Sequence, residues 1–262
     1  MICVFDCETI PDVELLSRVY GYHGDFLTIC EQAFAQAEKQ SGSAFLPHCF
    51  HKVITIAGLI AQPNGIMLSL GCFGEGKGER EIIKAFLTYL QKQPRLVSFN
   101  GRGFDMPILL LRAMRYNLQA EAYFETMNPS VGKDKWENYR QRFSERFHLD
   151  LFDSLGHFGA ATRGLKLHNI ACACHLPGKF DVHGDEVYRL YAEGRMSEIN
   201  TYCESDVLNT YWLFLKWQLL CGQFGLAHYR ACLQNLQEKI PKQKPYAAVF
   251  IEAIQAELTR SE

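Results

Sequence analysis

Five segments of the chain have the residue pattern of β-strands. The first is an apolar run at residues 2–5 that is rich in β-formers, and we expect it to continue into residues 6–9 and to stop at Pro11. Asn64-Gly65 separates two of the later runs, and this dipeptide is a strong signal for a hairpin. The expected strands are residues 2–9, 53–60, 66–73, 95–99 and 148–152.

Helical periodicity, with apolar residues three and four positions apart, marks most of the remaining chain. The expected helices are residues 12–40, 79–92, 105–117, 164–175, 185–193, 196–220, 223–237 and 246–259. Residues 121–147 are polar and aromatic and have only weak periodicity. A hairpin followed by alternating helices and strands predicts an α/β fold with a mixed β-sheet flanked by helices.

Composition and charge narrow the class of protein. Of the 262 residues, 48% are hydrophobic and 21% are charged, which is enough apolar surface to bury a core and excludes wholesale disorder. We expect one domain over residues 1–262, because this length is too short for a nuclease domain followed by a polymerase module. The formal net charge of −2 gives no global positive field, so contact with nucleic acid would need a local basic surface.

The sequence has no signal for secretion or membrane insertion. Its first ten residues contain no basic segment, and the longest apolar run, residues 53–61, is far shorter than the roughly 20 residues of a membrane span. Without a secretory signal, the ten cysteines are expected to be reduced thiols. We therefore expect a cytoplasmic protein that does not bind a membrane.

Two carboxylates lie at the end of the first expected strand. Asp6 and Glu8 are two positions apart, so in a strand both side chains point to the same face as Val4. Neighbouring carboxylates at a core edge are unfavourable unless a cation or hydrogen-bond donors neutralise them, and a divalent metal ion is the simplest neutraliser. The alternative is that Glu8 is solvated beyond the strand end and Asp6 caps a turn.

A third carboxylate, Asp105, precedes Met106-Pro107 at the expected start of a helix. An Asp before a proline-led helix is an ordinary N-cap. The loop from strand to helix would also present Asp105 at the carboxyl edge of the sheet, where ligands bind in open α/β folds. Both interpretations remain open on the sequence of this segment alone.

A fourth carboxylate, Asp206, lies on an expected helix at residues 199–217. It belongs to the apolar stripe that should face the core, and Tyr202 lies one turn away on the same stripe. Glu204 points away from the stripe and is expected to be solvated. The structural alternative for Asp206 is a buried carboxylate satisfied by a helix end or an arginine. The stripe consists of Ile199, Tyr202, Cys203, Asp206, Thr210, Leu213, Phe214 and Trp217.

Taken together, these residues resemble the three exonuclease motifs of the DEDDy 3′–5′ exonucleases, which share the DnaQ-like, ribonuclease-H-like fold. Within that superfamily the chain is similar to the predicted stand-alone exonucleases related to the proofreading domain of family-B DNA polymerases. The three motifs are Asp6-x-Glu8, Phe99-Asn100-Gly101-x-x-Phe104-Asp105 and Tyr202-x-x-x-Asp206. Further matches lie at residues 45–47, 50–53, 148–151, 176–179 and 202–210, and the resemblance spans about residues 2–222.

The resemblance implies an exonuclease domain with a ribonuclease-H-like α/β fold. Relative to the family's shortest members it would carry insertions at about residues 12–50 and 121–147, with further helices at about residues 223–262. The implied activity is metal-dependent hydrolysis of phosphodiester bonds from a 3′ end, with release of nucleoside 5′-monophosphates.

The resemblance also implies roles for single residues. The implied ligands of two Mg²⁺ or Mn²⁺ ions are Asp6, Glu8, Asp105 and Asp206. Tyr202 would orient the attacking water. Three residues would touch the terminal nucleotide: Thr9 through its backbone, Asn100 through its amide side chain and Phe104 by stacking on the base.

Single-stranded DNA 3′ ends are the expected substrate, and two alternatives remain. One is an exonuclease for RNA or oligoribonucleotides, because nothing in the sequence reads a 2′-hydroxyl. The other is a non-catalytic nucleic-acid-binding protein on the same fold, although the intact carboxylate set argues against it. Residues 133–148 carry five basic and three acidic side chains interleaved with aromatic ones. This pattern suits single-stranded nucleic acid, and it also suits a solvated cover over the core.

Overall fold

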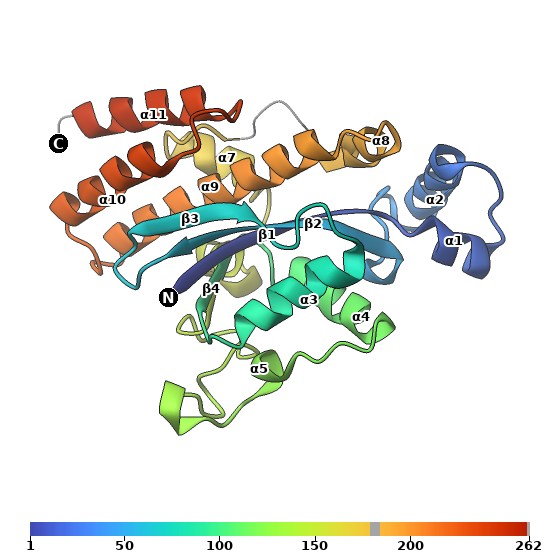
Figure 1. The fold of residues 1–262 in the computed structure, drawn as a ribbon, viewed down its shortest axis with the longest axis horizontal. Coiled ribbons are helices and arrows are strands. Elements are labelled where there is room, and N and C mark those ends of the chain that lie inside the picture. The colour runs from blue at the N-terminus through green and yellow to red at the C-terminus, as the bar shows by residue number, and fades with distance from the viewer. Residues whose placement is uncertain (179–183, 261–262) are drawn as a thin grey trace.

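Five strands form one sheet between two layers of helices (Figure 1). The computed structural model describes residues 1–178 and 184–260. The strands are β1 (Ile2–Pro11), β2 (His51–Ala61), β3 (Met67–Cys72), β4 (Arg95–Ser98) and β5 (His148–Asp150). Their order across the sheet is β3-β2-β1-β4-β5, with β1–β2 and β2–β3 antiparallel and β1–β4 and β4–β5 parallel. The mixed sheet expected from the sequence is confirmed, and its arrangement is consistent with a ribonuclease-H-like α/β fold.

Helices cover both faces of the sheet. The α-helices are α1 (Val13–Tyr20), α2 (Phe26–Ser41), α3 (Glu79–Leu90), α4 (Asp105–Arg115), α5 (Glu121–Phe124), α6 (Leu151–Leu155), α7 (Leu167–Ala173), α8 (Val187–Ala192), α9 (Met196–Leu220), α10 (Leu226–Lys239) and α11 (Ala247–Thr259). Short 3₁₀ turns are η1 (His48–Phe50), η2 (Pro129–Val131), η3 (His157–Gly159) and η4 (Gly184–Glu186). The layer of α7, α9, α10 and α11 lies on one side of the sheet and α3, α4 and α5 lie on the other, whereas α1 and α2 lie beyond the end of β1 (Figure 1). Within the described residues, none of these helices combines the length and the apolar character that a membrane crossing requires.

Two expected elements are shorter than the sequence pattern indicated. The helix expected at residues 12–40 is two helices, because Gly21 ends α1 in the left-handed conformation and Asp25 begins α2 by accepting a hydrogen bond from the backbone of Thr28 at 2.8 Å. The strand expected at residues 148–152 ends at Asp150, whose side chain caps α6. In each case a local hydrogen bond stops an apolar run that periodicity alone would extend.

Side-chain alternation along β1 divides the core between the two helical layers. Ile2 and Val4 pack with α9, α10 and α11, while Cys3 and Phe5 pack with α3 and α4. The two faces of β1 are therefore both buried, which explains why its first residues read as a continuous apolar run rather than an alternating one.

The helix α9 is buried on nearly all sides, which corrects the expectation of one core-facing stripe. Glu204, expected to be solvated, is only 4% exposed. The hydroxyl of Tyr246 donates to its carboxylate at 2.7 Å, and the ammonium of Lys244 lies 2.8 Å from it. Glu204 is buried because the C-terminal segment packs over the outer side of α9, and the helical period of α9 itself contains no information about that segment.

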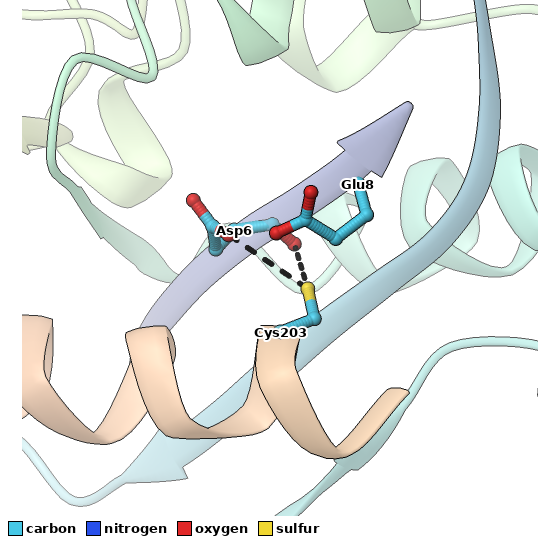
Figure 2. Close-up of side chains that lie close together, drawn as sticks. All are labelled: Asp6, Glu8 and Cys203. Carbon is cyan, nitrogen blue, oxygen red and sulfur yellow. Dashed lines mark hydrogen bonds between the residues drawn. The ribbon is translucent and has the colours of Figure 1, made fainter. Parts of the chain in front are cut away.

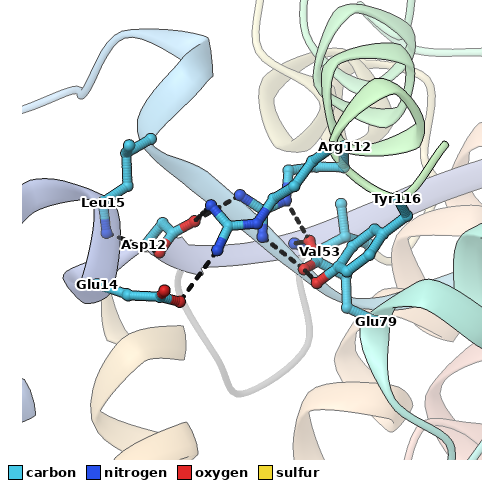
Figure 3. Close-up of polar contacts among 8 residues, drawn as sticks. Asp12, Glu14, Leu15, Val53, Glu79, Arg112 and Tyr116 are labelled. Atoms are coloured by element: carbon cyan, nitrogen blue, oxygen red, sulfur yellow. Dashed lines mark hydrogen bonds and ion pairs between the residues drawn. The ribbon is translucent and has the colours of Figure 1, made fainter.

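A buried ion-pair network joins the end of β1 to α3 and α4 (Figure 3). The guanidinium of Arg112 donates to both carboxylate oxygens of Glu79, at 2.6 and 2.5 Å, and to Asp12 at 2.5 Å. Glu79 also accepts from the backbone of Val53 at 2.8 Å and from the hydroxyl of Tyr116 at 2.7 Å. Asp12 is the N-cap of α1, so the network fixes the start of the inserted helices to the sheet.

Candidate active site

Asp6 and Glu8 lie on the face of β1 that meets α9, as side-chain alternation predicted (Figure 2). Pairing of β1 with β4 ends at Val4, so both carboxylates lie beyond the carboxyl end of β4 while β1 remains paired with β2. The thiol of Cys203 approaches from α9, with its sulfur 3.5 Å from the backbone oxygen of Asp6 and 3.8 Å from its Oδ2. Among the described residues, Asp6, Glu8 and Cys203 each offer one possible ligand atom for a metal ion, and these three atoms lie within 4.8 Å of one another.

Asp105 is the first residue of α4 and is only 3% exposed. Its Oδ1 accepts a hydrogen bond from the backbone amide of Cys7 at 2.9 Å. That amide is available because β4 ends at Ser98 and no longer pairs with β1 at this point. The N-cap position of α4 is Phe104, and no side chain caps this helix, so the capping interpretation of Asp105 is wrong.

Tyr202 and Asp206 are both buried on α9, one helical turn apart. Burial raises the pKa of the Tyr202 phenol well above its ordinary value. The carboxylates of Glu8, Asp206 and Asp6, together with a hydrogen bond to Asp206, raise it further. The phenol is therefore protonated at neutral pH and can donate a hydrogen bond into the carboxylate cluster.

The four acidic side chains come from three elements and interact electrostatically. Burial raises the pKa of Asp6 well above its ordinary value, and the charges of Asp105, Glu8 and Asp206 raise it further, while the hydrogen bond from the Cys203 thiol opposes them. Mutual repulsion of this kind means that the fully ionised cluster is unfavourable unless positive charge is supplied.

The pKa of Asp105 rises to about 6, chiefly because of burial. Hydrogen bonds from the amide and thiol of Cys7 lower it and the charge of Asp150 raises it. In the absence of metal ions, Asp105 is therefore about half ionised near pH 6.

The raised pKa of Asp105 predicts how the stability of the metal-free protein depends on pH. A carboxyl group whose pKa is higher in the folded than in the unfolded protein contributes stability below the unfolded value of 3.8, and that contribution is lost as the pH rises through about 6. In EDTA we expect the Tm to fall across this range, and we expect Asp105→Asn, which can still accept from Cys7, to weaken the dependence. Thermal melts of both proteins measure it, and equal pH profiles would contradict the raised pKa.

Thr9 and Phe104 flank the carboxylates. The hydroxyl of Thr9 lies 2.8 Å from Nδ1 of His51, whose Nε2 lies 3.1 Å from the carbonyl of Leu46. The carbonyl can only accept, so Nε2 carries the proton and Nδ1 accepts from Thr9. The ring of Phe104 is half-buried against the core. Its centroid lies 5.3 Å from that of the His51 ring and 5.4 Å from that of the Phe45 ring, so Phe104 is also part of an aromatic cluster.

Asn100 lies in a tight loop whose shape is set by Asp150. Its φ of 65° is in the left-handed region, and its amide donates to Oδ1 of Asp150 at 2.8 Å, while the amide of Arg102 donates to Oδ2 at 2.8 Å. A Cβ on Gly101 would lie 2.5 Å from the hydroxyl oxygen of Ser98, so only glycine fits there. The loop therefore holds Asn100 and the start of α4 in fixed positions.

Three of the residues around the site have no role that a local sequence pattern predicts. Asp150 was visible only within the family match at residues 148–151, yet its carboxylate organises the loop before Asp105. Cys203 was visible only as an apolar stripe residue, and His51 only as part of a family match. The proximity of all three to the carboxylates depends on strand pairing and helix packing rather than on any local pattern.

Residues 133–148 combine buried and exposed side chains, so neither a surface for nucleic acid nor a cover over the core accounts for all of them. Lys133 is buried and its ammonium donates to the carbonyl of Ala122 at 2.6 Å, and Tyr139 is also buried. Trp136 and Phe143 are instead 69% and 74% exposed. One side of this stretch thus covers the core, and the other presents aromatic rings at the surface.

Comparisons with known proteins identify relatives of this chain. Residues 43–254 match the family described as predicted 3′–5′ exonucleases related to the exonuclease domain of PolB. A DNA polymerase of Archaeoglobus fulgidus is 26% identical over 140 residues, which cover 51% of this chain but only 17% of that polymerase. The structure of the family B DNA polymerase from Pyrobaculum calidifontis aligns with 97% of this chain and 26% of the polymerase chain, with a TM-score of 0.49 and 16% identity. Because the family match covers most of the sequence, the chain belongs to the predicted 3′–5′ exonucleases related to the exonuclease domain of PolB.

Proposed function

We propose that residues 1–262 form a single domain that acts as a metal-dependent 3′–5′ exonuclease on single-stranded DNA. The observation that carries the proposal is the group of four carboxylates from β1, α4 and α9, in which burial and then the charges of Asp105, Glu8 and Asp206 raise the pKa of Asp6. Oxygen-rich, negatively charged sites of this kind suit Mg²⁺ and Mn²⁺, which prefer hard oxygen ligands. The donor set therefore fits divalent metal ions.

The proposed ligands of two metal ions are Asp6, Glu8, Asp105 and Asp206. Bound ions would stabilise the charge on the attacking and leaving oxygens of an in-line displacement at phosphorus. The chain supplies the remaining functions. Tyr202, held protonated by its buried and acidic surroundings and donating to Asp206, orients the attacking water through its hydroxyl oxygen, which accepts a hydrogen bond from that water. The products are nucleoside 5′-monophosphates.

The terminal nucleotide is proposed to lie against Thr9, Asn100 and Phe104. The ring of Phe104 is half-buried and immediately precedes Asp105, so a base stacked on it would place its phosphate near the carboxylates. Asn100 offers an amide side chain from a loop whose backbone is fixed by Asp150. Thr9 contributes through its backbone, because its hydroxyl is already bonded to His51.

A nuclease assay tests this function. Single-stranded DNA, double-stranded DNA and RNA of one sequence, each labelled at the 5′ end, are incubated with Mg²⁺ or Mn²⁺. We expect stepwise shortening of the single-stranded DNA from its 3′ end and no cleavage in EDTA. Faster degradation of the RNA would establish the oligoribonucleotide alternative in place of DNA.

Metal binding separates an enzyme from a non-catalytic relative. Ligands that bind only the folded state stabilise it by mass action, so saturating Mg²⁺ or Mn²⁺ should raise the Tm at pH 7 by about 5 °C over EDTA. Asp6→Asn should reduce this shift. Identical melting curves with and without metal, in the wild type and the variant alike, would favour a binding protein without metal-dependent catalysis.

We further propose a cytoplasmic location. All ten cysteines are free thiols. Cys7 and Cys203 lie beside the carboxylates, where burial and the surrounding negative charge raise the pKa of each thiol. A reducing compartment keeps such thiols in the state that donates hydrogen bonds to Asp105 and Asp6.

A further inference from the structure

A pocket of about 260 Å³ lies within the insertion at residues 12–50. It is lined by residues of α1, α2 and the segment that contains η1, it is open to solvent on one side, and it has no part in the proposed function. Its walls include four aromatic rings and two carboxamides, from Tyr20, Tyr22, Phe45, Phe50, Gln36 and Gln40.

Two side chains that line the pocket also contact a residue of the candidate active site. Phe45 and His48 line it, and their rings also contact the ring of Phe104, at 5.4 and 5.8 Å. Nε2 of His48 lies 2.9 Å from the carbonyl oxygen of Gly103, two residues before Asp105. Phe45 is 57% exposed and lies between the pocket and Phe104, so a chain that leaves the active site can reach the pocket across this ring.

The lining of the pocket matches a flat, uncharged, aromatic ligand. The rings of Tyr20 and Tyr22 stack at 5.5 Å, and Tyr20 contacts Phe50 at 5.3 Å. The hydroxyl of Tyr22 donates to Oε1 of Gln36 at 2.8 Å, which turns the amide group of Gln36 into a hydrogen-bond donor of fixed orientation. Among the described residues that line the pocket there is no aspartate, glutamate, lysine or arginine, so the lining offers stacking and amide hydrogen bonds rather than an ion pair with a phosphate.

We propose that this pocket holds an unpaired nucleobase of the substrate strand, on the 5′ side of the nucleotide that is removed. The proposal rests on the proposed function, because the 3′ end must lie at the carboxylates for the rest of the strand to pass Phe45. Nucleobases combine aromatic faces with donors and acceptors on their edges, and proteins that bind single strands recognise both features. A base within a duplex cannot enter, so the pocket favours single strands.

The test measures the affinity for single-stranded oligonucleotides that each lack one base. The abasic position is moved stepwise from the 3′ end, and binding is followed by fluorescence anisotropy in EDTA, where no hydrolysis takes place. For the wild type we expect one internal position at which the missing base lowers the affinity about tenfold, as the loss of one stacked base does.

Gln40→Glu tests the assignment of that position to the pocket. It places a carboxylate in the lining at an exposed position on α2, so the fold should be retained. The variant should bind the intact strand about tenfold more weakly and should show no further loss at the internal abasic position. Gln32→Glu makes the same change of charge on the same helix outside the pocket and should behave like the wild type.

Two results would overturn the proposal. One is a wild-type profile without an internal position of reduced affinity, and the other is an internal loss that persists in Gln40→Glu. In either case, metal-dependent shortening of single strands would leave the proposed exonuclease function intact. Absence of both binding and hydrolysis would remove the proposed function and this inference together.

Discussion

Asp206→Asn is expected to abolish turnover while the fold is retained. Asp206 lies on a helix that is buried on nearly all sides, and its charge raises the pKa of Asp6, so it contributes directly to the site that would attract metal ions. Loss of a carboxylate ligand should remove several kcal/mol of transition-state stabilisation, which corresponds to a reduction in rate of about 10³-fold or more. In EDTA the Tm should stay the same or rise, because repulsion within the cluster decreases.

Single-turnover cleavage of a 5′-labelled single strand measures the effect of Asp206→Asn. Glu198→Gln is the matched control, because Glu198 is an exposed carboxylate two turns earlier on α9 and pairs with Arg195. We expect wild-type cleavage by the control. Cleavage at a near-normal rate by Asp206→Asn would contradict the assignment of this residue to a metal site.

Tyr202→Phe should reduce turnover by about 10²-fold, the lower end of what a positioned orienting group contributes, and therefore by less than Asp206→Asn. All four carboxylates remain in this variant, so its affinity for metal ions should stay near that of the wild type. The loss should therefore appear in the rate of cleavage and not in the metal-induced rise of the Tm.

Tyr211→Phe provides the control for Tyr202→Phe. Tyr211 is a buried phenol on the same helix, and its hydroxyl donates to the carbonyl of Gly65 instead of reaching the carboxylates. The control should lose stability and keep its single-turnover rate. If Tyr202→Phe cleaves as fast as the wild type, the phenol has no part in the mechanism and only the ring of Tyr202 matters.

The sequence predicted the central sheet and the orientation of Asp6 and Glu8, because these depend on local periodicity. Alternation in a strand places both carboxylates on one face whatever the rest of the chain does. The role of Asp105 could not be decided in this way, since a capping residue and a site residue occupy the same place in the sequence. The structure corrects the capping interpretation, and the carboxylate of Asp105 instead accepts from Cys7, which is 98 positions away in the sequence.

The burial of Glu204 could not be predicted from helical periodicity. Helical periodicity located Asp206 and Tyr202 correctly on the buried side of α9, but it assumed that the other side faces water. The partners of Glu204, Lys244 and Tyr246, follow α10 and reach it only after the chain has turned back over α9. A pattern with a period of 3.6 residues describes a helix and its nearest core, and it contains no information about a second layer.

The network around Arg112 has a consequence for motion. Asp12 follows β1 directly, so the strand that carries Asp6 and Glu8 continues without a flexible joint into the inserted helices α1 and α2. A hinge at this point would have to separate Arg112 from Asp12, whose side chains are each only 4% exposed. Leaving one charge of a buried pair without its partner is strongly unfavourable, so a displaced arrangement of α1 should be rarely populated. We therefore expect the insertion to behave as a fixed spacer between its own pocket and the carboxylates, and not as a lid that opens and closes over them.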